Sequence, residues 1–312
     1  MHAGSASAAL PRRLSRTVPP VVFRRVAFAA VGVLILIVAT GATVRLTGSG
    51  LGCPHWPTCT TKHALPRGYH SDIEFSNRVV SAVTVFTTLV LALAAWRTRG
   101  LGRRGRWLAT AVFAGTLAQA PLGAITVYYD LNPYLVITHL LLSFTLVSLA
   151  VLTLLEASRL VRGGGTPLPG IARLGGVALA VAVVGLALSG TAATAAGRFP
   201  GSSGAKIVPR LGRFEPAVYW HVRTVAAFGI VFLVLAGWAW TQRTAYPWLL
   251  RGCAGVLAIL AVQMTIGEVQ YRTYGDVPWW LVLLHVATAA TLVGWTVGVV
   301  GRLWRPVGAE AT

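Results

Sequence analysis

Apolar runs of about 20 residues recur along the whole 312-residue chain and are separated by short polar segments. Runs of this length are typical of helices that cross a membrane. Only 11% of the residues are charged, which is about half the share found in soluble proteins. We expect an all-α membrane protein with eight spans, at residues 23–47, 74–96, 107–128, 133–157, 171–196, 217–241, 247–269 and 278–303.

The basic residues predict the orientation of these spans. A net charge of +19 would suggest nucleic acid as a partner of a soluble chain, but here the charges lie between apolar runs. With both termini in the cytoplasm, most lysines and arginines fall on the inner side, as the positive-inside rule requires. The outer segments then hold Lys62, Arg67, Arg198, Lys206, Arg210, Arg213 and Arg272. We expect no nucleic-acid partner.

The first run has the flanks of a signal peptide, because Arg24 and Arg25 precede it and small residues follow it. It continues to about Val44, however, which is longer than the apolar region of a typical signal peptide. A retained helix is therefore the favoured interpretation. Residues 1–20 are expected to form a disordered cytoplasmic tail.

Two cysteines lie in the first outer segment, GLGCPHWPTC. Cys53 and Cys59 are six residues apart and could close a small disulfide loop in an oxidising compartment. A zinc site with His55 and His63 is the alternative, although the spacing matches no standard zinc pattern. We favour the disulfide.

The chain also repeats itself. The segments beginning at Gln119 and Gln263 are 144 residues apart, and each contains a glycine at the same offset, Gly123 or Gly267. Such a period indicates a duplicated structural unit. We expect a four-helix unit at 21–160, a glycine-rich linker at 161–170, a second four-helix unit at 171–305 and a tail at 306–312. Because each unit has an even number of spans, the two tandem bundles would be pseudo-symmetric about an axis along the membrane normal.

The repeat places polar residues at one depth near the outer face. His139 corresponds to His285, with an offset of 146 because one turn is longer, and the 144-residue offset carries Asn77 to His221. Two neutral imidazoles on facing helices can bind haem iron. An intramembrane histidine can also be a hydrogen-bonding contact between helices. The repeated pair favours a haem site in the second unit.

Glu74, Asn77 and Arg78 project from one face of the second helix, because they stand at positions i, i+3 and i+4. One interpretation is an ion pair between Glu74 and Arg78; the other makes Glu74 a proton acceptor or electrostatic stabiliser in a cavity. Arg45, Arg78 and Arg223 lie inside spans and are candidates for holding haem propionates. In the alternative interpretation, these arginine side chains extend to the outer membrane–water interface and bind no propionate.

Taken together, these motifs resemble the haem A synthase family over essentially the whole folded chain. The most specific segments are TGSGLGCPHWPTC at 47–59, IEFSNR at 73–78, the QxxxG…P…H block in both halves and YWHVR at 219–223. The resemblance implies oxidation of a methyl group of haem O to the formyl group of haem A, by successive hydroxylation, for terminal oxidase assembly. It also implies a multi-pass protein of the bacterial plasma membrane.

The resemblance further implies the site residues. His221 and His285 would be the axial ligands of a resident haem b, while the first unit would hold the substrate haem, with His139 as ligand and Glu74 near the reacting edge. Cys53 and Cys59 match the family's outer cysteine pair. Haem O synthase and an electron-transfer protein are possible further partners, beside membrane lipid.

Asn77 departs from the family pattern, in which many members have histidine at this position. A substrate haem bound through His139 alone would leave one iron position open. Two other functions remain as alternatives: a multi-haem cytochrome b-type electron carrier without substrate conversion, and a transporter. A pure carrier should keep both histidine pairs, and a transporter should have helices broken at the midplane.

Overall fold

The computed structural model describes residues 17–53, 55, 58–60, 65–202 and 208–308, and in these ranges the protein is all-helical apart from isolated bridges. All of its helices are long and apolar enough to cross a membrane. The helices are α1 (Pro20–Leu46), α2 (Tyr69–Arg97), α3 (Arg103–Tyr128), α4 (Pro133–Arg162), α5 (Gly170–Ala196), α6 (Phe214–Thr241), α7 (Pro247–Arg272) and α8 (Trp279–Trp304). The prediction of eight spans in an all-α protein is confirmed.

Several helices extend beyond the apolar runs that predicted them, and α2 and α4 do so by the most at one end. α2 begins at Tyr69, five residues before the expected start at 74, and α4 continues to Arg162 rather than 157. Apolar composition locates only the part of a helix that suits lipid, whereas the backbone hydrogen bonds continue through flanking polar residues. As a result Glu74 and Asn77 lie inside α2 and not at its first turn.

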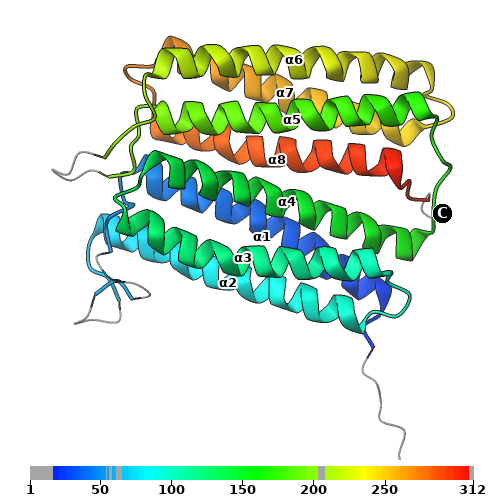
Figure 1. The fold of residues 1–312 in the computed structure, drawn as a ribbon, viewed down its shortest axis with the longest axis horizontal. Coiled ribbons are helices and arrows are strands. Elements are labelled where there is room, and N and C mark those ends of the chain that lie inside the picture. Colours follow the sequence, from blue (N-terminus) through cyan, green and yellow to red (C-terminus); the bar gives the residue numbers. More distant parts are fainter. Residues whose placement is uncertain (1–16, 54, 56–57, 61–64, 203–207, 309–312) are drawn as a thin grey trace, which may run out of the picture.

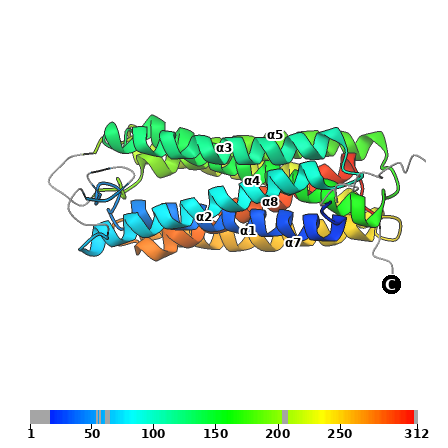
Figure 2. The ribbon, with the colours of Figure 1, turned by 90° about the horizontal axis from the view of Figure 1, so that it is seen from below.

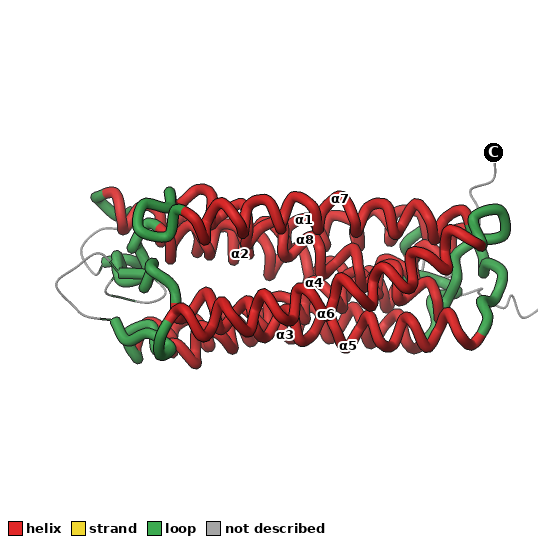
Figure 3. The backbone as a smooth tube through the Cα atoms, turned by 90° about the horizontal axis from the view of Figure 1, so that it is seen from above, coloured by secondary structure: helices red, strands yellow, loops and turns green. Residues whose placement is uncertain are grey.

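The helices run along the long axis of the molecule, with the loops gathered at its two ends (Figure 2, Figure 3). In Figure 1, α1–α4 lie together in the lower half and α5–α8 in the upper half, with α4 beside α8. α1 contacts α2, α4 and α8, and α8 contacts α5 and α7 as well as α4. The start of α1 and the end of α8 lie at the same end of the molecule. The side of the membrane to which this end belongs stays a prediction, as does the division into two units.

Small residues on α8 allow it to approach α4 closely. A Cβ atom on Gly294 would lie 3.1 Å from Val147, and one on Gly301 would lie 2.6 Å from Leu155. Within membranes, glycines of this kind let helix backbones approach and gain van der Waals contact. The two halves of the chain are therefore packed directly against each other.

Hydrogen bonds join the halves at both ends. At the end with the 47–68 loop, an Arg45 guanidinium nitrogen donates to the Thr194 carbonyl at 3.2 Å, and the Gly50 N–H donates to the Gly201 carbonyl at 2.7 Å. At the other end, Arg305 pairs with Glu156 at 2.9 Å.

The described parts of the two expected tails contact the rest of the protein. The Val18 N–H donates to the Arg97 carbonyl at 3.1 Å, and the Pro306 carbonyl accepts hydrogen bonds from Arg159 and from the Gly165 N–H. These contacts involve residues of both expected tails; residues 1–16 and 309–312 lie outside the described residues, and the disorder expected for the first tail stays a prediction.

Candidate functional site

A cavity of about 810 Å³ lies among α1–α4, towards the end with the 47–68 loop. Its walls are mostly apolar, and a few residues of α5, α8 and the segment before α6 complete it. The predicted residues of the first half converge on it, together with one glutamine: Arg45 from α1, Glu74, Asn77 and Arg78 from α2, Gln119 from α3 and His139 from α4. The cavity thus brings together the candidate haem-site groups of this half, whereas the candidate cysteines Cys53 and Cys59 do not line it.

His139 is held through the backbone of its own helix. The side-chain amide of Gln119 donates to the His139 carbonyl at 3.1 Å and to the Ser143 hydroxyl at 2.8 Å. Gly123 leaves space beside the ring, because a Cβ atom there would lie 3.6 Å from His139 Cε1. The Nδ1 atom of His139 is buried and has no partner among the described residues.

His285 has the same surroundings in the second half. The Gln263 amide donates to the His285 carbonyl at 2.8 Å and to the Thr288 hydroxyl at 2.9 Å, and a Cβ atom on Gly267 would lie 3.5 Å from His285 Cε1. His285 Nδ1 is likewise buried without a partner among the residues described. The two glutamines stood in the sequence repeat, but their role as supports for the histidine helices was not predicted.

The residues on α2 and α6 also have matching neighbours. The Thr40 hydroxyl donates to Asn77 Oδ1 at 2.8 Å, and the Ser189 hydroxyl forms a 3.0 Å hydrogen bond with His221 Nδ1. Thr40 and Ser189 are 149 residues apart in the sequence. The hydroxyl on the first helix of each half therefore contacts the corresponding side chain on the second helix.

Glycines follow both hydroxyl residues. A Cβ atom on Gly190 would lie 3.1 Å from His221 Cε1, whereas one on Gly41 would lie 4.0 Å from Asn77 Oδ1. Asn77 therefore occupies in the first half the position that His221 occupies in the second half, and there is more space between Asn77 and the neighbouring glycine. The sequence comparison predicted that Asn77 corresponds to His221 but missed the correspondence of Thr40 with Ser189, because α1 and α5 match at a different offset from the rest of the repeat.

The two histidines of the second half face each other. The ring centroids of His221 and His285 are 6.5 Å apart, with the ring planes at 82°. Ser189, which contacts His221, also bonds to the Thr224 hydroxyl at 2.5 Å. The imidazole of His221 is thus fixed by a short chain of hydroxyl groups.

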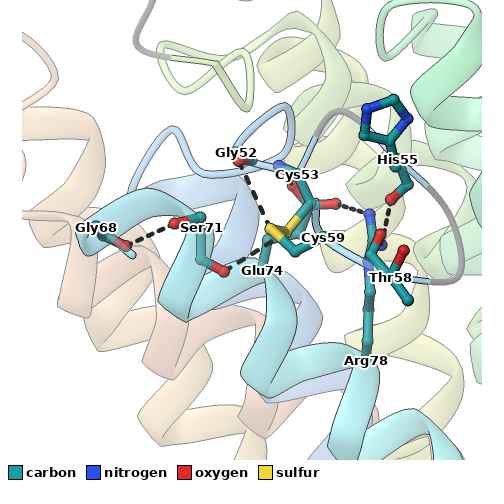
Figure 4. The surroundings of a disulfide bond; sticks show 9 residues. All are labelled: Gly52, Cys53, His55, Thr58, Cys59, Gly68, Ser71, Glu74 and Arg78. Atoms are coloured by element: carbon teal, nitrogen blue, oxygen red, sulfur yellow. Dashed lines mark hydrogen bonds and ion pairs between the residues drawn. A yellow bond between two sulfur atoms is a disulfide. The ribbon is translucent and has the colours of Figure 1, made fainter. Parts of the chain in front are cut away.

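Glu74 and Arg78 bind the disulfide loop (Figure 4). Cys53 and Cys59 form the predicted disulfide, and the expected ion pair joins Arg78 to Glu74 Oε1 at 2.6 Å. The Cys53 N–H donates to the other carboxylate oxygen, Oε2, at 2.8 Å. In addition, Arg78 donates to the carbonyls of His55 at 2.7 Å and Thr58 at 3.0 Å. Glu74 is buried, so its charge is balanced by these donors.

The alternative zinc site is not formed by the described residues, in which no group of three or more His, Cys, Asp or Glu side chains could hold a metal ion. His63, which that interpretation needed, lies outside the described residues. His55 contributes its backbone carbonyl to the Arg78 contact.

The remaining charged residues of interest differ in whether they face the cavity or the surface. Arg45 lines the cavity, and its Nε atom is buried without a partner among the residues described. Arg223 is exposed on α6 and stacks over the Tyr219 ring at 3.2 Å from its centroid. Glu268 forms an exposed ion pair with Arg272 at 2.6 Å. Arg45 is therefore the uncompensated positive charge nearest to the cavity interior.

The chain is similar to proteins of known families. The model of the cytochrome oxidase assembly protein family COX15-CtaA matches residues 24–73 and 69–297. The Heme A synthase of Staphylococcus haemolyticus is 36% identical over 125 residues, which are 38% of this chain and 41% of that protein. The Heme A synthase of Bacillus pumilus is 33% identical over 132 residues, 41% of this chain and 43% of the relative.

A third relative, the Heme A synthase of Geobacillus thermodenitrificans, is 33% identical over 107 residues, a third of each chain. The aligned part of this chain thus spans less than half the length of these curated relatives. The family model, in contrast, covers most of the helical region. The chain belongs to the COX15-CtaA family of cytochrome oxidase assembly proteins.

Proposed function

We propose that this protein is a haem A synthase of the bacterial plasma membrane, which oxidises a methyl group of haem O to the formyl group of haem A. One observation carries the proposal: the chain has a facing histidine pair in one half and, in the other, a large cavity with a single histidine, a carboxylate and an amide. An electron-transfer site beside an open substrate site is what such an oxidation needs.

The second half is proposed to hold haem b as a resident cofactor between His221 and His285. The ring centroids of these two residues are 6.5 Å apart, so the two imidazoles are close enough to hold one iron ion between them. When bound, haem b would supply one-electron redox chemistry.

The first half is proposed to bind the substrate, haem O. Its cavity of about 810 Å³ lies within the range of about 300–1,000 Å³ usual for ligand sites, and its mostly apolar walls suit a porphyrin. His139 would be the ligand of the substrate iron. Arg45, with an unpartnered Nε, is the best placed group for a propionate carboxylate, to which it could form charge-assisted hydrogen bonds. Arg78 already binds Glu74 and two loop carbonyls, and Arg223 lies away from this cavity.

Glu74 is proposed to act at the edge of the substrate nearest to the disulfide loop. The hydroxylations and the loss of water that follows them involve proton transfers, and a carboxylate that lines the cavity can take part in them as a general acid or base. The ion pair with Arg78 keeps this carboxylate oriented. His139 and Glu74 would then be the catalytic residues of the first half.

The competing function is an electron carrier with two haems and no substrate conversion. Asn77 argues against it, because an amide is a poor iron ligand and a carrier gains from two strong axial ligands in each half.

The decisive experiment is to purify the protein after co-expression with a haem O-producing enzyme and to extract its haem. We expect haem B together with haem A. A His139→Ala variant should retain the haem b spectrum and yield no haem A. Recovery of only haem B and unmodified haem O from intact wild-type protein would refute the proposal, and an unchanged haem A yield in His139→Ala would refute the assignment of the first site.

A further inference from the structure

We propose that Asn77, oriented by Thr40, is a hydrogen-bond donor for a small ligand that binds opposite His139 on the substrate haem. The ligand class is a small hydrogen-bond acceptor, either an anion or an oxygen-containing oxidant. This inference rests on the proposed function, because it takes the cavity of the first half as the substrate haem site.

The position of Asn77 follows from the matching contacts in the two halves. His221 contacts Ser189, and Asn77 makes the corresponding contact with Thr40. His221 faces His285 across 6.5 Å, and His285 has the same glutamine and glycine neighbours as His139. Asn77 therefore faces His139 across the first cavity, which both residues line.

Asn77 is smaller than His221 and leaves free, in the first half, the space that the His221 ring fills in the second half. A Cβ atom on Gly190 would lie 3.1 Å from the His221 ring, but the equivalent atom on Gly41 would lie 4.0 Å from Asn77 Oδ1. An amide is shorter than an imidazole, so it leaves a space at the position of the missing ring. A small molecule could occupy this space without displacing protein atoms.

The hydrogen bond from Thr40 determines which end of the amide is available. Asn77 Oδ1 accepts from the Thr40 hydroxyl at 2.8 Å, so the NH₂ group is the end left over. No other described residue accepts a hydrogen bond from this NH₂ group; Ser81 contacts only the backbone carbonyl of Asn77. An asparagine NH₂ group carries two donors. Asn77 thus presents two N–H donors that no described residue uses.

The nearest acidic group does not compete for these donors. Both carboxylate oxygens of Glu74 are already bound, one by Arg78 and the other by the Cys53 N–H. The site consequently favours a ligand that accepts hydrogen bonds.

Fluoride binding to the ferric first-half haem tests this directly, because fluoride is a small anion and a strong hydrogen-bond acceptor. The purified full-length protein is loaded with ferric haem O in the absence of any electron donor or oxidant, so that no turnover occurs, and its fluoride affinity is measured by optical titration. One hydrogen bond to a charged ligand corresponds to roughly 10–100-fold in affinity. We expect Asn77→Leu to lose about that factor and Thr40→Val to lose about 3–10-fold, since the amide is then no longer oriented.

A matched control is Thr87→Val on α2, because Thr87 is only half-buried, does not line the cavity and donates its hydroxyl to the Val83 carbonyl of its own helix. It should bind fluoride like the wild type. The second-half haem b spectrum reports whether each variant is folded. Equal fluoride affinity in wild type, Asn77→Leu and Thr40→Val, in proteins that load haem O normally, would overturn the inference and leave the proposed function standing.

Asn77→His gives a second, independent readout. Asn77 corresponds in position to His221, so the imidazole introduced by this substitution should ligate the substrate iron. The ferric spectrum of the first-half haem should then become low spin, and fluoride should no longer bind. A first-half haem that stays high spin and binds fluoride in this variant would contradict the placement of Asn77 opposite His139. Failure of the wild-type protein to load haem O at all would instead refute the proposed function, and this inference with it.

Discussion

The backbone N–H of Cys53 donates a hydrogen bond to Oε2 of Glu74 at 2.8 Å, and the same carboxylate binds Arg78 through its other oxygen. Arg78 in turn holds two carbonyls of the loop that the Cys53–Cys59 disulfide closes. The loop and the wall of the large cavity are therefore one connected unit. A change in the disulfide loop should therefore alter the position of the Glu74 carboxylate and leave the second half of the chain unchanged.

Replacing both cysteines, Cys53→Ala with Cys59→Ala, should lower stability and haem A formation together. Closing a loop of this size contributes about 2 kcal/mol in the chain-entropy description. We expect a lower thermal unfolding temperature and a reduced ratio of haem A to haem b, measured by extraction from purified protein. The haem b spectrum should persist. A double variant with an unchanged ratio would show that the loop does not position Glu74.

Glu74→Gln separates the charge of this residue from its role as an acceptor. The glutamine carbonyl can still accept from the Cys53 N–H, but the ion pair with Arg78 is lost. We expect haem O to accumulate in the protein while haem A formation falls by about 10²-fold or more, the usual effect of losing a general base. Glu215→Gln is the matched control, because Glu215 is an exposed carboxylate near Arg213. Normal haem A formation in Glu74→Gln would exclude Glu74 as the proton acceptor.

His221→Ala or His285→Ala should each remove the low-spin haem b spectrum, because each deletes one of two facing rings. His55→Ala provides a matched histidine control, since His55 is exposed and contacts Arg78 through its backbone carbonyl. Optical and electron paramagnetic resonance spectra of the purified variants would report the loss. Persistence of a bis-histidine signal in either variant would place haem b elsewhere.

Gly190→Ala should weaken haem b binding through the position of one ring. The added Cβ atom would lie 3.1 Å from His221 Cε1, so the imidazole has to shift. Gly185→Ala on the same helix meets nothing within 4 Å and serves as the control. A well-packed site typically loses about 1–3 kcal/mol to such overpacking. The measurement is the rate of haem loss to an acceptor protein, and equal rates in the two variants would refute the role given to Gly190.

Much of this architecture was predictable because the signals are local. The length and apolar character of each run predicted the eight helices, and the cysteine spacing in an outer loop predicted the disulfide. Both predictions are confirmed. The proximity of Arg45, Asn77 and His139 was harder to predict, since it depends on how four helices pack. The internal repeat supplied that information only for the parts that match in sequence.

The contact between Thr40 and Asn77 could not be predicted, for a physical reason. α1 and α5 correspond at an offset of 149, whereas α2 and α6 correspond at 144, because the loop after α1 is longer than the loop after α5. In lipid, small and apolar residues are interchangeable over much of a helix surface, so the first helices of the two halves have diverged. Only the structure aligns Thr40 with Ser189.

The hydrogen bonds between the halves at both ends of the molecule bear on how the two proposed haem sites would communicate. Arg45 and Gly50 are bound to the second half at one end, and Arg305 is bound to Glu156 at the other, with glycine-mediated packing between them. These contacts would have to break for one half to rock against the other, which is the motion that an alternating-access carrier needs. The protein would instead act as a fixed spacer, in which the tunnelling distance between donor and acceptor is set when the chain folds and does not depend on a later motion.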